Sequence, residues 1–336
     1  MSMRWYVIRR LIWAVVATYL ALSLTFGLLT LSPNRGELQA AMRAAQTGQS
    51  PQKAMKKYRK RKNLDEPFIE RYINYVVNMF TLNWGWSTLR QQPVTTAISN
   101  AWPMSAQFMI PATIISIIFG YGIGLYSAMH QYETSDYIGT FIAFFGISIP
   151  NFWFAIVLIL ITGVWFRDAT LFGISLKPFA LPIYYQSTVP MFSLANVRQL
   201  ILPTIVVSTA GVAGQMRYSR AQALEYANAE FVKVAKAKGA GERRLLLRHI
   251  LRVALVPLAT ILVADFLALL WTGSVIVETI FQIPGIGLLA FKAITNNDTA
   301  LIMATTLIPV FLAIFGNLLQ DLAYVVLDPR IDYGDR

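Results

Sequence analysis

The sequence predicts an all-α, polytopic membrane protein with about six transmembrane helices. Two observations lead to this fold class: the composition and the length of the uncharged runs. The chain has 336 residues, of which 56% are hydrophobic and 14% are Asp, Glu, Lys or Arg. A soluble globular protein has roughly 25% charged residues. The hydrophobic side chains are therefore expected to face lipid as well as one another.

The first uncharged run covers residues 11–31 and directly follows Arg9 and Arg10. It is long enough to cross a hydrocarbon layer of roughly 30 Å as a helix. A secretory signal peptide is the alternative, but its apolar region is shorter, roughly 7–15 residues, and ends at a small-residue cleavage site. Residues 1–31 are thus predicted to form an N-terminal tail and the first transmembrane helix.

Residues 32–103 turn polar and are predicted to form an extracytoplasmic loop domain. This loop includes a basic run from residue 53 to residue 62, for which the sequence suggests no role. Pro103 and Pro111 interrupt the beginning of the next uncharged run, so the second span is expected at residues 105–128.

The predicted membrane core, residues 104–328, holds five spans in all. After the second span, the others are expected at residues 137–166, 199–216, 253–277 and 299–320. Pro150 lies in the middle of the first of these runs and is expected to kink that helix, because proline removes a backbone donor.

Two more uncharged stretches are not predicted to span. Residues 178–197 are rich in proline and polar side chains and are expected to form a loop. Residues 279–291 are too short and contain Pro284 and Gly285, so they are expected to form a re-entrant or interfacial turn. Residues 329–336 are left as a short tail.

The distribution of basic residues predicts the orientation. Long loops are translocated regardless of their charge, so the first loop is left out of the comparison. Most of the other Lys and Arg residues then fall on the side that holds both termini and the loop 217–252. Both termini of this multi-pass protein are accordingly predicted to be cytoplasmic, in the plasma or inner membrane.

Composition also excludes several classes of function. The net charge is +12, but the basic residues flank membrane spans, where topology and docking explain them better than nucleic-acid binding does. There is no cysteine and there are only two histidines, so no catalytic or metal-binding constellation is predicted. The chain also lacks the Gly-x-x-x-x-Gly-Lys-Ser/Thr loop that cradles nucleotide phosphates.

The loop 217–252 is the most informative part of the chain. A helix-forming run ends at Gly239, where a left-handed residue can close a helix, and a second amphipathic helix begins at Glu242. A basic helix–glycine–helix hairpin of this kind can dock a cytoplasmic partner. A solvated loop that only sets topology, or one that holds anionic lipid headgroups, is an equally weighted alternative on charge alone.

Several motifs resemble those of ABC importer permeases of the dipeptide/oligopeptide group, in the same order along nearly the whole chain. The resemblance is most specific at Phe231-Val232-Lys233-Val234-Ala235-Lys236-Ala237-Lys238-Gly239, followed by Glu242-Arg243-Arg244. Other matching motifs are Arg9-Arg10-Leu11, Asn83-Trp84-Gly85-Trp86-Ser87, Ser148-Ile149-Pro150-Asn151-Phe152-Trp153, Val277-Glu278-Thr279-Ile280-Phe281, Pro284-Gly285-Ile286-Gly287 and Leu327-Asp328-Pro329-Arg330.

The resemblance implies a non-enzymatic transport subunit that imports peptides or related small solutes. ATP would be used by separate ATP-binding cassette subunits, and this chain would bind no cofactor. The other implied partners are a second homologous permease, an extracytoplasmic solute-binding protein and membrane lipid. The implied ATPase-coupling residues are Phe231, Val232, Ala235, Lys236, Ala237, Lys238, Gly239, Glu242, Arg243 and Arg244.

Three acidic residues are candidates for the translocation path. Asp265 lies inside the predicted fifth span, Glu278 follows the end of that span, and Asp321 follows the end of the sixth. Charged groups within a membrane are costly, which favours an interior or watery location, although pairing for structural reasons is an equal alternative. Asp265 and Asp321 are also the only support for a competing function, an ion-coupled secondary transporter.

The glycines in Gly120-Tyr121-Gly122-Ile123-Gly124 are expected to lie at close helix crossings. They do not form a nucleotide-binding fingerprint, because they sit inside an apolar helix without a preceding strand.

Overall fold

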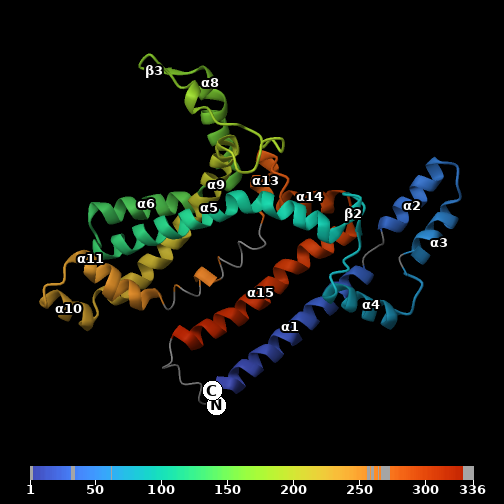
Figure 1. Ribbon diagram of the computed structural model, residues 1–336, viewed down its shortest axis with the longest axis horizontal. Coiled ribbons are helices and arrows are strands. Elements are labelled where there is room, and N and C mark those ends of the chain that lie inside the picture. The colour runs from blue at the N-terminus through green and yellow to red at the C-terminus, as the bar shows by residue number, and fades with distance from the viewer. Residues whose placement is uncertain are drawn as a thin grey trace. The chain divides into compact units, whose positions relative to one another are not determined.

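The computed structural model describes residues 3–31, 35–61, 63–255, 258, 261–263, 265 and 273–327. The regular secondary structure of the described chain is helical apart from two short hairpins, which confirms the predicted all-α class (Figure 1). It forms two compact units. One consists mainly of Met1–Asn100 with Ala290–Leu318, and the other mainly of Ala101–Leu289.

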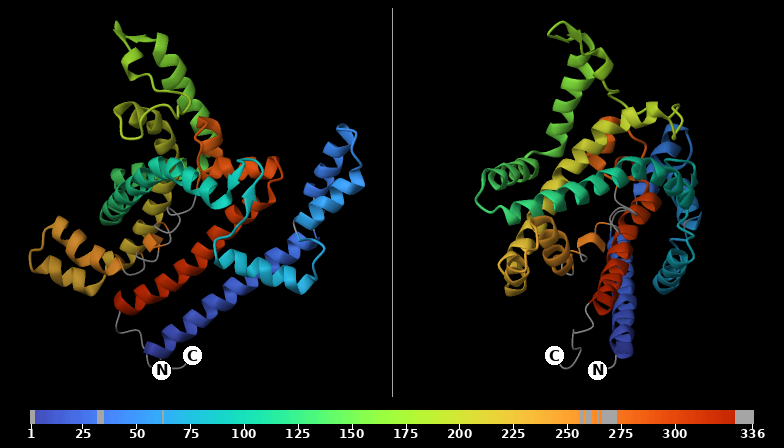
Figure 2. Two further views of the ribbon diagram at one scale, coloured as in Figure 1. Left: turned by 45° about the vertical axis from the view of Figure 1, so that its right-hand side comes forward. Right: turned by 60° about the vertical axis from the view of Figure 1, so that its left-hand side comes forward.

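The first unit begins with α1 (Met3–Leu31), which packs against α4 (Phe68–Phe80). Phe26 of α1 is the centre of this contact, with ring centroids 5.3 Å from Tyr72 and 5.2 Å from Tyr75. Along the chain, α2 (Arg35–Gln46) and α3 (Pro51–Arg61) come between α1 and α4 and form a helical hairpin, which Figure 2 shows as two neighbouring helices. The predicted first-loop domain is therefore largely helical.

A buried aspartate, Asp298, connects two segments of the same unit by hydrogen bonds. The strands β1 (Trp86–Ser87) and β2 (Gln92–Pro93) pair antiparallel, with Trp86 opposite Pro93. Asp298 accepts hydrogen bonds from Ser87 Oγ at 2.6 Å and from the Leu89 amide at 3.0 Å. Its second oxygen accepts from the Leu301 amide in the first turn of α15 (Thr299–Leu327).

The second unit is built around α5 (Val94–Met129), α6 (Thr134–Ser148) and α9 (Leu194–Ala227). Gly120 and Gly124 of α5 face α9 so closely that a Cβ atom at either position would meet a carbonyl oxygen of Val212 or Met216 within 3.0 Å. Gly122, on the other side of α5, faces open space. The expectation that these glycines lie at a close helix crossing is confirmed for Gly120 and Gly124.

The remaining elements of this unit are short. After α6 come α7 (Asn151–Leu158), the π-helix η1 (Ile159–Trp165), α8 (Phe166–Asp168), the hairpin β3 (Thr170–Leu171) and β4 (Ile174–Ser175), and the 3₁₀ turn η2 (Lys177–Phe179). After α9 come α10 (Glu230–Ala237), α11 (Glu242–Arg244), the π-helix η3 (Leu245–Ile250) and α13 (Val275–Phe281). Helix α14 (Ile286–Thr295) begins in this unit.

By length and composition, five described helices can span a membrane: Val7–Leu28, Val94–Met129, Asn151–Asp168, Leu194–Ala227 and Thr299–Gln320. The bent pair α13 and α14, which turns by 91°, would be a sixth if it counts as one broken span. The break lies where the sequence predicts a turn, at Pro284 and Gly285. About half of the predicted fifth span, residues 253–277, lies outside the described residues.

Two expectations about proline are wrong. The helix expected to kink at Pro150 is instead interrupted: α6 ends at Ser148, and Ile149 and Pro150 are both extended, because the residue before a proline disfavours helical backbone. Conversely, Pro103 and Pro111 do not break α5, which begins at Val94 and continues through both. Membrane helices tolerate such prolines when neighbouring groups satisfy the freed backbone.

Candidate functional site

Helices α10 and α11 with η3, residues 230–250, form a lobe that follows the end of α9 (Figure 1). Helix α10 ends as the sequence predicted. Gly239 has a φ of +76°, and its amide donates to the Lys236 carbonyl at 2.9 Å. The Ala240 amide donates to the Ala235 carbonyl at 3.0 Å, so the last carbonyls of the helix are satisfied. Glycine takes this backbone conformation without the steric cost that a side chain would bring.

One face of α10 is packed into the protein. Val232 is 1% exposed and joins a core with Leu245 and Ile250 of the lobe and Leu125 of α5. Ala235 lies in the same core, which also includes Ala223 of α9. The lobe is therefore anchored on the ends of two long helices.

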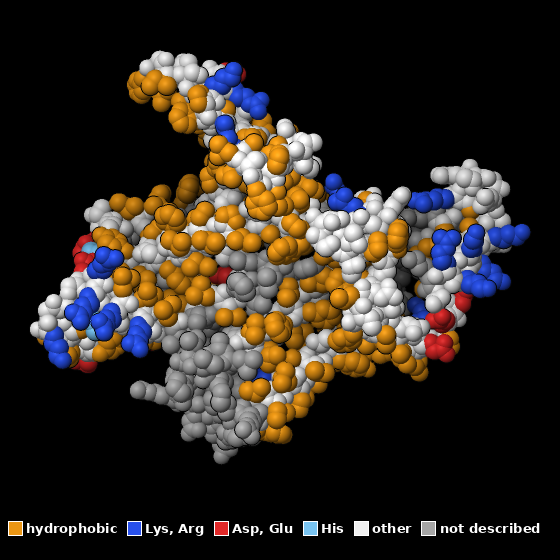
Figure 3. Space-filling model, in the orientation of Figure 1, with side chains coloured by type: hydrophobic (Ala, Val, Ile, Leu, Met, Phe, Trp, Pro, Cys, Tyr) orange, Lys and Arg blue, Asp and Glu red, His pale blue; other side chains and the backbone are white. Residues whose placement is uncertain are grey.

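The other face of α10 is open. Phe231 is 41% exposed and Val234 is 51% exposed, with Lys233 and Lys236 beside them. Figure 3 shows Lys and Arg side chains gathered over this lobe. Of the ten predicted coupling residues, Val232 and Ala235 are buried and the other eight are exposed: Phe231, Lys236, Ala237, Lys238, Gly239, Glu242, Arg243 and Arg244.

The short loop between α5 and α6 also contacts the lobe. His130 Nε2 lies 3.1 Å from Glu242 Oε1 at the start of α11. The His130 ring stacks on Tyr126, with the two centroids 4.1 Å apart, and its Nδ1 lies 3.0 Å from the Tyr126 carbonyl oxygen. The structure thus brings together a predicted coupling residue and a loop that the sequence did not connect with it.

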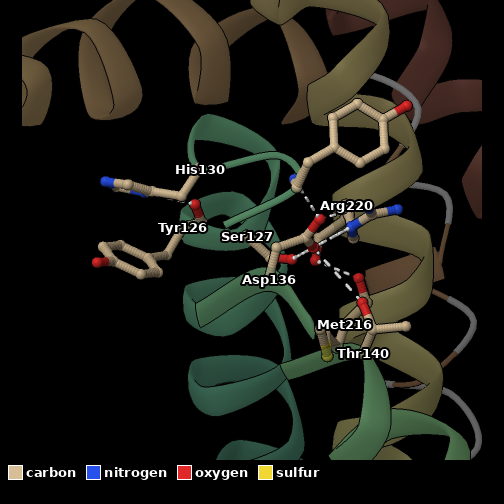
Figure 4. Close-up of polar contacts among 9 residues, drawn as sticks. Tyr126, Ser127, His130, Asp136, Thr140, Met216 and Arg220 are labelled. Atoms are coloured by element: carbon tan, nitrogen blue, oxygen red, sulfur yellow. Dashed lines mark hydrogen bonds and ion pairs between the residues drawn. The ribbon is translucent and has the colours of Figure 1, made fainter. Parts of the chain in front are cut away.

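A buried carboxylate lies at the base of this loop (Figure 4). Asp136, 3% exposed, accepts from Arg220 Nε at 2.8 Å and from Arg220 Nη2 at 2.9 Å. Ser127 Oγ and the Tyr132 amide also donate to it. The Arg220 hydrogen bonds hold the pKa of the Asp136 carboxyl well below its ordinary value, so it is ionised at neutral pH.

Sequence reasoning missed this cluster. Its signal was a single acid and a single arginine, both next to long apolar runs, and charged groups at such positions need partners. Nothing in the sequence indicated that these two side chains are each other's partner.

The three acidic path candidates have different surroundings. Glu278 has no exposed surface; its Oε1 accepts from Ser105 Oγ at 2.7 Å and its Oε2 accepts from the Leu288 amide at 2.7 Å. Asp265 is half-buried and accepts from Gln215 Nε2. Asp321 lies in α15, but its side chain is outside the described residues. The structure brings none of the three together in a single described cluster.

Apolar helices long enough to cross a membrane, with a small surface lobe at their ends, define the class of this protein as a multi-pass membrane protein. Residues 120–333 match the family model described as the binding-protein-dependent transport system inner membrane component. The chain belongs to this family. It is the permease subunit of an ABC importer, a non-catalytic membrane component that binds no cofactor and works with ATPase and solute-binding partners.

Full-length relatives agree with this assignment. The chain is 32% identical to the oligopeptide transport system permease protein AppB of Bacillus subtilis, over 98% of this chain and 99% of the relative. It is 29% identical to OppB of Haemophilus influenzae, an oligopeptide transport system permease, over 98% and 99%. It is 31% identical to DppB of Bacillus subtilis, a dipeptide transport system permease, over 97% of both chains.

Proposed function

We propose that this permease imports peptides and that its 230–250 lobe is the surface on which the ATPase subunit docks. The observation that supports docking is the two-faced character of α10. Val232 and Ala235 fix the helix to the protein, while Phe231 and Val234 leave apolar surface open between basic side chains. An exposed amphipathic helix of this kind fits a groove on a partner. The peptide cargo rests on the relatives, which are oligopeptide and dipeptide permeases.

In this proposal both termini and the lobe are cytoplasmic, and α2 and α3 lie on the opposite side of the membrane. The basic lobe meets the positive-inside rule, whereas the long first loop is exempt from it. The loop between α5 and α6 then lies on the ATPase side as well, because His130 contacts Glu242.

The proposed mechanism is mechanical. A second homologous permease would complete the path, and a solute-binding protein would deliver the peptide on the other side of the membrane. Closure of the ATPases on ATP would displace α10, and the displacement would pass through Val232 and Leu125 to α5. The Asp136–Arg220 pair would keep α6 and α9 together during this movement, because it joins the two helices directly.

Among the acidic candidates, Asp265 and Asp321 remain the proposed path residues. A carboxylate there could hold the cationic end of a peptide. Glu278 is better suited to a structural role, because both of its carboxylate oxygens are already engaged by protein donors.

The test of docking compares two glycines of the lobe. A Cβ atom would find open space at both Gly239 and Gly241, but Gly239 has a φ of +76° and Gly241 a φ of −68°. Alanine at 239 is therefore strained by about 1 kcal/mol, and alanine at 241 is not. Gly239→Ala is expected to lower the amount of ATPase subunit that co-purifies with a tagged chain, and Gly241→Ala to leave it near the native level.

The same preparations measure function. ATP hydrolysis stimulated by the binding protein, and uptake of a labelled dipeptide into vesicles, are both expected to fall for Gly239→Ala. Native levels of co-purified ATPase subunit and of uptake in both variants would contradict docking on the lobe. Uptake of sugars but not of peptides would contradict the proposed peptide cargo and leave the proposed ATPase docking unaffected.

A further inference from the structure

The α2–α3 hairpin has a basic surface that transport and ATPase docking leave unexplained. Helix α3 has no buried residue, and its cations give the hairpin the blue patch seen in Figure 3. Arg59 alone has acidic partners on this helix in the described chain, with Asp65 at 3.0 Å and Glu37 at 3.6 Å. Within the same part of the chain, Lys53, Lys57 and Arg61 form no ion pair.

These three cations face a cleft between α2 and α3. They are spaced four residues apart, which places them on one side of the helix. The cleft has a volume of about 450 Å³, and its other lining residues are Ala40, Gln49, Ser50, Ala54 and Tyr58. Its walls thus offer ammonium, guanidinium, hydroxyl and amide donors, and none of the lining residues is acidic. Such a donor set suits a phosphate group.

Helix α4 keeps the hairpin close to lipid. Its inner face packs on Ser23 and Phe26, with Ser23 Oγ 2.6 Å from Tyr72 Oη. Both residues belong to the part of α1, Val7–Leu28, that is apolar enough to span the membrane. A helix that packs against this part of α1 lies at the depth of the membrane or at its surface.

The outer face of α4 has the character of a lipid-facing surface. Ile69, Ile73, Val77 and Phe80 follow one another at helical spacing and are 51–68% exposed. An apolar stripe of this kind, next to a basic segment, is typical of a helix that lies in the membrane interface. The turn from α3 to α4 is short and is tied to α3 by the Arg59–Asp65 pair, so the end of α3 is held beside this interfacial helix.

We propose that the cleft formed by Lys53, Lys57, Arg61 and Tyr58 binds the phosphate headgroup of an anionic phospholipid. The bound lipid fixes the α2–α3 hairpin to the membrane surface while α4 lies in the interface. A lipid accounts for both observations, the unpaired cations and the apolar stripe beside a spanning helix, whereas an acidic protein accounts only for the cations. The site is independent of ATPase docking.

The test uses two charge-matched variants of the full-length chain. Lys53→Gln/Lys57→Gln removes two cations from the cleft, and Lys56→Gln/Lys60→Gln removes two exposed cations of the same helix that do not line it. Native mass spectrometry of the detergent-solubilised chain, titrated with phosphatidylglycerol or phosphatidylcholine, measures lipid binding. Because each cation near an anionic headgroup contributes about a fivefold factor, the cleft variant is expected to lose tenfold or more in phosphatidylglycerol affinity.

The control variant is expected to bind phosphatidylglycerol nearly as the native chain does, and Lys53→Arg/Lys57→Arg to retain binding because the charges remain. Equal losses in the two glutamine variants would overturn the proposal, since they would indicate diffuse attraction without a cleft. Unchanged lipid binding in the cleft variant would also overturn it. If that variant in addition lost its solute-binding protein in pull-down, the cleft would be a protein-docking site.

Discussion

Arg220 of α9 and Asp136 of α6 form a two-pronged ion pair, although they are 84 residues apart in the chain. Each carboxylate oxygen accepts one N–H of the guanidinium, and Ser127 at the end of α5 donates to the same carboxylate. Three helices thus meet at one charge, directly below the loop that contacts Glu242. The pair therefore joins α6 and α9 at the junction of lobe and spans, through which the proposed movement would pass.

Replacing Asp136 should therefore destabilise the permease. Asp136→Ala leaves the Arg220 guanidinium, 27% exposed, without its acceptor, and we expect a loss of about 1.5–3 kcal/mol, the range for hydrogen bonds to charged groups. Arg220→Ala should cost a similar amount, because it leaves a buried carboxylate unpaired. Thermal unfolding in detergent measures both, and the double variant should be less destabilised than the sum of the two. If the loss of stability in the double variant equalled the sum of the two single losses, the interaction between Asp136 and Arg220 would be contradicted.

The pair also predicts a pH dependence. The pKa of Asp136 is lower in the folded chain than its unfolded value of about 3.9, so its contribution is complete above that value and is lost as pH falls through the folded pKa. The stability difference between the native chain and Asp136→Asn should thus be constant from neutral pH down to about pH 4 and shrink below it. Melting temperatures measured over this range check the expectation. A difference that shrinks already near pH 6 would contradict it.

The glycines of α5 predict a sharp positional contrast. A methyl group at Gly120 or Gly124 would meet backbone atoms of α9, which cannot move aside as the end of a side chain can. We expect Gly120→Ala and Gly124→Ala each to cost about 1–3 kcal/mol through overpacking. Gly122→Ala should be neutral or stabilising by up to about 1 kcal/mol, since its Cβ meets nothing and alanine is the better helix former. The same thermal unfolding assay applies, and equal effects at the three positions would contradict the crossing.

Variants at two valines of α10, Val232 and Val234, distinguish the folding of the lobe from its docking to the ATPase subunit. Val232→Ala removes buried methyl groups and should destabilise the chain by about 2 kcal/mol. Val234→Ala removes a half-exposed side chain, so the melting temperature should stay near the native value while co-purification of the ATPase falls. Measuring both quantities for both variants distinguishes the two roles. Lost ATPase binding in Val232→Ala alone would show that Val234 lies outside the docking surface.

The sequence was sufficient where local physics decides the structure. The last span begins at Thr299 as predicted, because a charged residue, Asp298, ends the preceding segment. Gly239 closes α10 because the run before it forms a helix and glycine alone adopts positive φ without strain. Small residues in an apolar helix predict a close helix crossing at Gly120, Gly122 and Gly124, and the structure has the crossing at Gly120 and Gly124 but not at Gly122.

The sequence was insufficient to predict the structure where contacts between residues far apart in the chain determine it. Whether a proline breaks a helix, as Pro150 does, or is absorbed, as Pro111 is, depends on neighbouring groups that satisfy the backbone. Asp136 and Arg220 lie in different predicted segments, and one chain without an alignment gives no pairing signal between them. Glu278 was recognised as unusual, but its burial against Ser105 could not be read from the apolar run around it.

Glu278 and Ser105 give the last prediction, on the turn between α13 and α14. Ser105 Oγ donates to Glu278 Oε1 at 2.7 Å and accepts from the Ile286 amide at 2.8 Å, so this hydroxyl links α5 both to α13 and to the start of α14. Ser105→Ala leaves that amide buried without a partner, which should cost about 1–3 kcal/mol. Glu278→Gln keeps the shape but points an N–H at one of the two donors, so a similar loss is expected. Ser99→Ala, an exposed position on the same helix, is the control and should be neutral.

Thermal unfolding measures the stability of these variants, and uptake of peptide over a range of concentrations separates KM from maximal rate. A structural role predicts lower stability with KM unchanged; a raised KM at native stability would instead place Glu278 in contact with the peptide.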